Sequence, residues 1–211
     1  ALLLALSAQD VSFTTSSKDL CDPEELKARF RASDKIPAYD ITKEKFKLVV
    51  PKSYAPAAKW GLFVYINADD SPGLPAEYEP LLEKRKLLAV AAYKSGNGRN
   101  IFDRFRLATD AVINLQKKYN LDPGRIYVSG FSGGARTASM LAVAYADLFS
   151  GAIPLCGVNF YTEIPSEPRG GTSSLQHGGL FEIWVSMREG IPAKKALAVV
   201  EKEIRQLISK G

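Results

Sequence analysis

Residues 125–140 of this 211-residue chain read RIYVSGFSGGARTASM. A short apolar run suited to a buried strand leads into GFSGG, and a helical pattern of small residues follows at once. The segment therefore contains G-x-S-x-G in the setting of strand, tight turn and helix that a nucleophile elbow requires. We predict that Ser132 projects from the carboxyl end of a strand, and that Gly130 and Gly134 lack side chains because strand and helix approach closely there. The alternative is a glycine-rich turn between a core strand and a helix.

A helix that begins at this turn points its amino terminus toward Ser132. The backbone N–H of Gly133 is therefore a candidate donor to negative charge that develops on a substrate oxygen. A second donor is expected in the loop after the apolar run at 62–66, where Asn67 and Ala68 are the candidate positions. The HGGG-type oxyanion motif is absent from that loop.

Apolar runs and helical periodicities alternate along the chain on both sides of this turn. The alternation predicts the α/β class, with a doubly wound, mostly parallel sheet and helices on both of its faces. Strands are expected at 45–50, 62–66, 87–92, 125–129, 151–157 and 180–185, and helices at 23–31, 75–86, 101–119, 133–145 and from 192 onward. Residues 122–124 are expected to form the turn before the elbow strand, and 162–179 a surface loop.

The composition is that of one ordinary globular domain. A chain of 211 residues with 46% hydrophobic and 24% charged residues is long enough for a single buried core. The net charge of +5 comes from basic residues interleaved with acids, which indicates a solvated surface and no nucleic-acid role. No apolar run has the length of a membrane span. The chain has one histidine, so a Cys/His metal site is not expected.

The first ten residues, ALLLALSAQD, resemble the end of a secretory signal peptide, with an apolar run before a small-x-small cleavage pattern. Residues 1–8 are then a signal remnant, 9–211 form a single domain, and the protein is secreted or periplasmic. The alternative is an ordinary buried N-terminal segment. Cys21 and Cys156 fit either one disulfide in an oxidising compartment or two separate thiols.

Residues 119–134, 145–149 and 152–157 together resemble the esterase branch of the α/β-hydrolases. The pattern is most similar to secreted polyhydroxybutyrate depolymerase-like and feruloyl esterase-like enzymes, most strongly over 87–160. The resemblance implies an α/β-hydrolase fold and hydrolysis of a small-molecule or polymeric carboxylic ester through a serine acyl-enzyme, without a cofactor. A prolyl oligopeptidase-like serine peptidase and a noncatalytic secreted binding module on the same fold are the alternatives.

A serine hydroxyl is a weak nucleophile, so it needs a base within hydrogen-bonding reach and an acid that orients the base. In this fold the three residues follow the chain order Ser, Asp or Glu, His. Glu189, in the segment after the expected strand at 180–185, is the candidate acid, and a solvated glutamate is the alternative. His177, the single histidine, is the candidate base, although it precedes the acid; the alternative is an exposed loop histidine.

Two further groups of residues follow predicted strands and are candidates for the substrate site. Gly96, Asn97 and Arg99 lie in the loop after the 87–92 strand, and Phe160 and Tyr161 follow the 151–157 strand. The alternatives are ordinary turn residues and ordinary core aromatic residues.

The order of these candidates also predicts a longer reading frame. The chain stops at a helix end, whereas the fold expects one more strand followed by the catalytic histidine. We therefore expect that strand and that histidine to be encoded downstream, and residues 1–211 alone to show little esterase activity. The sequence downstream of Gly211 checks this expectation. A stop codon there, together with activity that is lost in His177→Ala, would contradict it.

Overall fold

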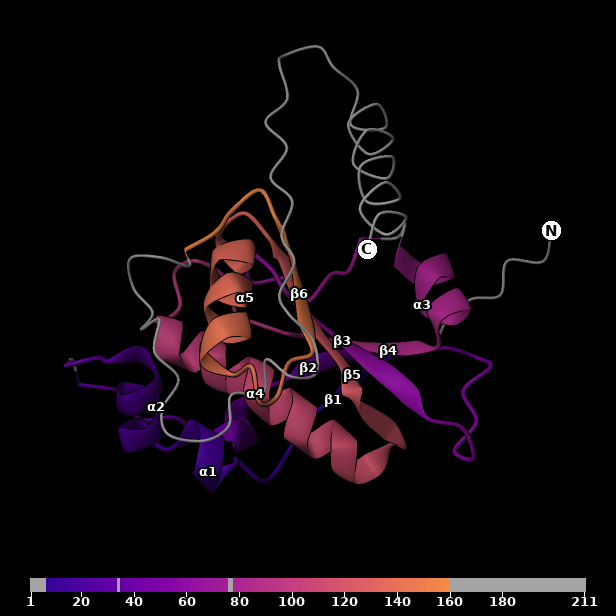
Figure 1. The fold of residues 1–211 in the computed structure, drawn as a ribbon, viewed down its shortest axis with the longest axis horizontal. Helices are drawn as coiled ribbons and strands as arrows, with labels where there is room; N and C mark the ends of the chain where they lie inside the picture. The colour runs from indigo at the N-terminus through magenta and orange to yellow at the C-terminus, as the bar shows by residue number, and fades with distance from the viewer. Residues whose placement is uncertain (1–6, 34, 76–77, 160–211) are drawn as a thin grey trace, which may run out of the picture. The chain divides into compact units, whose positions relative to one another are not determined.

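The computed structural model describes residues 7–33, 35–75 and 78–159 of the chain. Over these residues six strands form one sheet in the order β1-β2-β4-β3-β5-β6 (Figure 1). The strands are β1 (Ser7–Val11), β2 (Phe46–Val50), β3 (Trp60–Ile66), β4 (Leu87–Ala92), β5 (Leu121–Phe131) and β6 (Gly151–Leu155). The helices are α1 (Lys18–Cys21), α2 (Pro23–Phe30), the 3-10 helix η1 (Ile41–Lys43), α3 (Glu79–Arg85), α4 (Ile101–Lys118) and α5 (Gly133–Ala144).

The sheet is parallel over most of its width. β4, β3, β5 and β6 pair in parallel, whereas β1 and β2 at one edge pair antiparallel. Helices α3, α4 and α5 each connect one parallel strand to the next along the chain, because parallel pairing requires a crossover. The predicted α/β class and mostly parallel sheet are confirmed.

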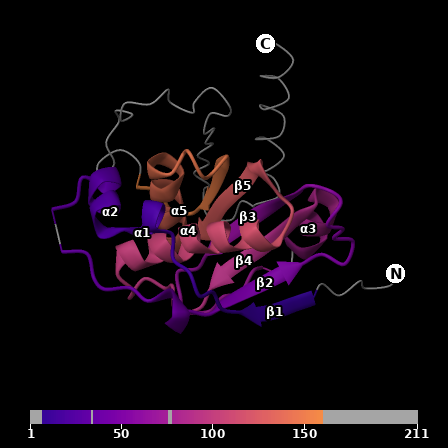
Figure 2. The same cartoon turned by 90° about the horizontal axis from the view of Figure 1, so that it is seen from below.

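Helices cover both faces of the sheet, as the sequence predicts. One core contains Val64 of β3, Val112 of α4 and Leu141 of α5. The core on the other face contains Phe63 of β3 and Leu82 of α3. Successive residues of a strand point to opposite faces, so β3, which is buried at every position, supplies both cores. Figures 1 and 2 show α4 and α5 together and α3 apart from them.

Several predicted elements lie where the sequence places them. β4 covers 87–92, and α2 begins after Asp22, whose carboxylate accepts a hydrogen bond from the Glu24 N–H at 2.8 Å. α4 begins after Asn100, which caps the Phe102 N–H at 2.9 Å. α3 is shorter than the predicted 75–86 helix. The short helices α1 and η1 are not indicated by the sequence, because so few residues show no helical period.

The turn predicted at 122–124 lies inside a strand and not before it. β5 starts at Leu121, pairs with β3 there, and pairs again from Ile126 onward. Between these two paired positions β5 has more residues than β3, so the extra residues form an irregularity within the strand. The N–H of Gly124 donates to the Asp122 carboxylate at 3.0 Å, so the predicted turn chemistry shapes this irregularity.

The two cysteines are free, so the alternative of a disulfide is wrong. The Cys21 thiol is buried and lies 3.2 Å from the Thr109 hydroxyl and 3.2 Å from the Asp110 carboxylate, whereas Cys156 is exposed. Burial raises the pKa of the Cys21 thiol to about 12, so the thiol stays protonated and donates to Asp110. Cys21 is therefore part of the packing between α1 and α4.

The predicted signal cleavage site falls within a strand. Ser7 pairs with Val50 and Gln9 pairs with Leu48, so cleavage before Gln9 would take Ser7 and Ala8 out of β1. Export stays a prediction. In the part of the chain that the structure describes, no helix is long and apolar enough to cross a membrane. The strand expected at 180–185, the loop at 162–179 and the helix from 192 lie outside the described residues.

A buried carboxylate ties the N-terminal segment to α4. Asp110 is fully buried and accepts hydrogen bonds from the Ser16 hydroxyl and the Ser17 N–H, both at 2.7 Å. Burial raises the pKa of Asp110 above its ordinary value. The stability linked to this shift is present at low pH and is lost as the pH rises through the raised folded-state pKa.

We predict that Asp110→Asn becomes more stable relative to the wild type as the pH rises from about 4 to about 7. The amide keeps one oxygen, which can accept from the Ser17 N–H, and its NH2 can donate to the Ser16 hydroxyl, but it does not ionise. Urea unfolding of both proteins across this range measures the difference in the free energy of unfolding. A difference that does not change with pH would contradict the prediction.

Candidate active site

The parallel strands end at one edge of the sheet, because they run in the same direction. The segments that follow β3, β4, β5 and β6 therefore meet at this edge, and they contain residues 67–73, 93–100, 132 and 156–159. In open α/β sheets the carboxyl edge is where ligands bind. The candidate site is built at this edge.

Ser132 stands between β5 and α5 in a strained backbone conformation. Its φ of 52° and ψ of −114° are rarely adopted by a residue with a side chain. Its N–H donates to the carbonyl of Leu155 in the neighbouring strand at 2.8 Å, which ties the turn to the sheet. The structure thus places Ser132 in the sharp turn between strand and helix that the sequence predicts.

Close backbone contacts explain the glycines around Ser132. A Cβ on Gly130 would lie 2.5 Å from the carbonyl oxygen of Ile66 and 2.5 Å from the carbonyl carbon of Gly134. A Cβ on Gly134 would overlap the same Ile66 oxygen and lie 3.1 Å from the carbonyl carbon of Asn67. The end of β3, the turn and the start of α5 are therefore in direct backbone contact, as predicted.

The loop after β3 is held by hydrogen bonds on both sides. The Asn67 side-chain amide donates to two carbonyls further along the same loop, at 2.5 and 2.9 Å. The carbonyl of Asn67 accepts from Arg104 of α4 at 2.9 Å, and the carbonyl of Ala68 accepts from the Asn97 N–H at 2.9 Å. Among the described residues, no acceptor takes the backbone N–H of Ala68 or of Gly133.

Of the three candidate residues after β4, Asn97 lies at the elbow. A Cβ on Gly133 would overlap the Asn97 side-chain amide, so this exposed amide packs against the start of α5. Gly96 packs against the loop after β3, and its N–H donates to the Asp70 carboxylate at 3.1 Å. The loops after β3 and β4 therefore support each other beside Ser132.

Arg99, the third of these candidates, is held in an ion-pair cluster. Its guanidinium donates two hydrogen bonds to Glu44, at 2.6 and 2.9 Å, and one to Asp103 at 3.3 Å. The hydrogen bonds to Glu44 and the charge of both carboxylates raise the pKa of Arg99. Its side chain is committed to this cluster, which favours the structural alternative for Arg99.

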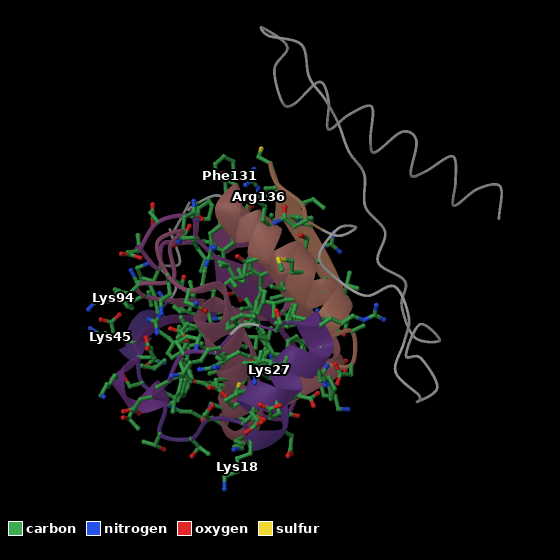
Figure 3. All side chains as sticks on the ribbon, turned by 90° about the vertical axis from the view of Figure 1, so that its left-hand side faces the viewer. Lys18, Lys27, Lys45, Lys94, Phe131 and Arg136 are labelled. Carbon is green, nitrogen blue, oxygen red and sulfur yellow. The ribbon has the colours of Figure 1, made fainter. Side chains whose placement is uncertain are left out.

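Two exposed side chains flank Ser132. Phe131, directly before it, is 50% exposed, and Arg136 in the first turn of α5 is also exposed. Figure 3 shows Phe131 and Arg136 together at one end of α5, away from Lys45 and Lys94. An apolar ring and a cation are thus both exposed beside Ser132.

The candidate acid Glu189 and the candidate base His177 lie outside the described residues, as do Phe160 and Tyr161. Within the described ranges, no group forms a hydrogen bond with the Ser132 hydroxyl, and no cluster of His, Cys, Asp or Glu side chains is arranged to hold a metal ion. The roles of Glu189 and His177 stay sequence predictions.

Arg104 is a part of this edge that the sequence analysis does not single out. Its guanidinium donates a hydrogen bond to the loop after β3, and its side chain is buried, with 5% exposed, although it carries a charge. Its spacing from Ala108, Val112 and Leu115 places it on the apolar face of α4. A charged residue within an apolar helical stripe is the signal that identifies such a position from sequence.

The sheet order, the crossover helices and the elbow define an α/β-hydrolase fold. Acetyl xylan esterase from Aspergillus awamori shares it at 18% identity, with a TM-score of 0.51 over 69% of this chain and 50% of the esterase. Prolyl oligopeptidase B from Galerina marginata shares it at 17% identity, with a TM-score of 0.50 over 71% of this chain and 20% of the peptidase. At these identities the likeness shows the fold alone.

In sequence the chain is similar to poly(3-hydroxyalkanoate) depolymerase C from Paucimonas lemoignei, with 41% identity over 46 residues. This match covers 22% of the chain and 11% of the depolymerase. No protein-family model matches the chain. The chain thus spans half or less of the length of each of these relatives. The sequence match and the shared fold confirm the predicted resemblance to depolymerase-like and esterase-like α/β-hydrolases.

We predict that Gly134→Ala lowers the free energy of unfolding by about 3 kcal/mol, because its methyl group overlaps a backbone oxygen of the central strand β3. Gly98→Ala is the matched control, since a Cβ on Gly98 meets nothing within 4 Å. Its effect should stay within about 0.5 kcal/mol. Urea unfolding followed by circular dichroism measures both variants. Equal effects in the two would argue against the close contact at the elbow.

Proposed function

We propose that this protein is a serine hydrolase that cleaves carboxylic esters through an acyl-enzyme on Ser132. The observation that carries the proposal is the strained turn that holds Ser132 at the carboxyl edge of the sheet, directly before the amino terminus of α5. The sequence similarity to a depolymerase supports an ester substrate, either a small molecule or a polymer. The proposed location is secreted or periplasmic, and secretion would bring the protein to a polymer outside the cell.

In the proposed reaction the Ser132 oxygen attacks the carbonyl carbon of the ester, and its proton passes to a general base. The carbonyl oxygen becomes an oxyanion, and the alcohol leaves with the proton that the base returns. Water then attacks the acyl-enzyme, which releases the carboxylic acid and restores the Ser132 hydroxyl. His177 and Glu189 are the candidates for base and acid within this chain.

We propose that two backbone N–H groups stabilise the oxyanion. The Gly133 N–H lies at the amino terminus of α5, where the helix dipole favours negative charge. Of the two positions after β3 we favour Ala68, because its N–H has no acceptor among the described residues. Each preorganised donor of this kind lowers the barrier by about 3 kcal/mol.

A serine peptidase of the prolyl oligopeptidase kind is the second candidate, because such an enzyme has the same fold as this chain. The two candidates differ in the bond that they cleave, an amide or an ester, and both use a serine nucleophile. A noncatalytic binding module on this fold would instead contain an unactivated serine. These differences define the experiments.

In the complete protein, Ser132→Ala should lower kcat/KM for short acyl esters by a factor of about 10⁴ or more, because the acyl-enzyme cannot form. The variant should fold, since no described group depends on the Ser132 hydroxyl. A fluorophosphonate should label the wild type stoichiometrically at Ser132. Ser150→Ala is the control: Ser150 lies next to the amino end of β6, and its loss should leave turnover and labelling unchanged.

Ester turnover that survives in Ser132→Ala would reject the proposal. A wild type that takes up no fluorophosphonate would favour the noncatalytic module. Turnover that depends on Ser132 but prefers peptide amides over acyl esters would favour the peptidase.

A further inference from the structure

Arg104 is a buried cation without a counter-charge among the described residues. It lies near the start of α4 and is 5% exposed. Desolvation lowers the pKa of its guanidinium, which means that burial of the charge costs free energy here. A cavity of about 10 Å³ beside it is lined mainly by apolar side chains of β3, β4 and α4. An apolar side chain would suit these surroundings better than an arginine.

The one side-chain hydrogen bond of Arg104 within the described chain is directed at the loop after β3. Its Nη2 donates to the carbonyl oxygen of Asn67 at 2.9 Å, while its Nε has no partner among the described residues. The peptide bond between Asn67 and Ala68 is trans, so its N–H points away from its carbonyl. With Arg104 on the carbonyl side, the Ala68 N–H is turned to the opposite side.

The same peptide borders the elbow. The carbonyl carbon of Asn67 lies 3.1 Å from the position of a Cβ on Gly134 in the first turn of α5. The carbonyl of Ala68 accepts from the Asn97 N–H at 2.9 Å, and the Asn97 side chain packs against Gly133. Both carbonyls of this short segment are therefore engaged, and the Ala68 N–H is left without a described acceptor.

We propose that Arg104 is a positioning residue, which fixes and polarises the Asn67–Ala68 peptide so that the Ala68 N–H donates to the oxyanion. This inference rests on the proposed function. Arg104 does not touch the substrate in this arrangement. A charge-assisted hydrogen bond to a carbonyl withdraws electron density from its peptide and makes the N–H of that peptide a stronger donor. The guanidinium thus acts on the reacting oxygen through one peptide unit.

Three substitutions in the complete protein test this role. Arg104→Lys keeps the charge, Arg104→Gln keeps a neutral donor, and Arg104→Met keeps neither. We expect kcat for a short acyl ester to fall about 100-fold in Arg104→Met and less in Arg104→Lys, with a much smaller change in KM, because the oxyanion forms only on the way to the intermediate. Affinity for a trifluoromethyl ketone, which forms a hemiketal oxyanion with the serine, should fall in parallel with kcat.

Arg106 provides the matched control. It lies on the same helix, is 2% exposed, and donates to a backbone carbonyl, that of Pro37, at 2.9 Å. Pro37 lies outside the loops around Ser132. Arg106→Met should therefore keep the wild-type kcat and ketone affinity, whatever either substitution does to the Tm. Circular dichroism confirms folding at the assay temperature, and Arg104→Lys and Arg104→Gln decide the test if Arg104→Met does not fold.

Folded Arg104 variants with the wild-type kcat and ketone affinity would overturn the inference. An equal loss of kcat in Arg106→Met would also overturn it, since the effect would then come from general destabilisation of α4. If the wild-type protein shows no ester turnover, or turnover that does not depend on Ser132, the proposed function is overturned, and this inference with it. The experiments therefore distinguish failure of the inference about Arg104 from failure of the proposed function of Ser132.

Discussion

The rest of the structure depends on a contact between backbone atoms at the centre of the sheet. The carbonyl of Ile66, at the end of β3, lies against the backbone at Gly130 and Gly134. No side chain fits in this space, so the turn from β5 to α5 must be short and sharp. The turn in consequence leaves Ser132 at the edge of the sheet with a helix amino terminus beside it.

The rigidity that this contact needs comes from β3. All of its residues are buried, and alternate side chains pack against helices on opposite faces of the sheet. Hydrogen bonds from β5 and β4 hold it on both sides. A strand confined in this way does not move to relieve strain in the turn, which is why Ser132 remains at a φ of 52°.

Departures from ordinary local rules gather at the same edge. Ser132 has a strained backbone, Arg104 is a buried charge without a described counter-charge, and the N–H groups of Gly133 and Ala68 have no described acceptor. Elsewhere the caps of α2 and α4 follow local preferences, although Asp110 and Arg106 of α4 are also buried ionisable residues. Proteins carry such departures where function requires them, and the stability of the surrounding core compensates for them.

Local sequence was sufficient to predict the elements whose physical basis is local. Residues close together in the sequence determine these features: the apolar run of β4, the Asp22 cap of α2, the amphipathic period of α4 and the glycines of the elbow. Candidate positions after β3 and β4 also followed, because loops after parallel strands meet at one edge. The short helices α1 and η1 did not, since so few residues show no helical period, and the inclusion of residues 121–125 in β5 did not, since it depends on pairing with the distant strand β3.

Only the tertiary structure decided which contacts each residue at this edge makes. Sequence treats Asn97 and Arg99 as equivalent loop positions, yet one packs on Gly133 and the other binds Glu44. It likewise shows Arg104 only as a charge within an apolar stripe, whereas the fold joins it to the Asn67 carbonyl. The reason is physical: a turn or a helical period is set by neighbours in the chain, but a hydrogen bond between distant segments exists only once the sheet has brought them together.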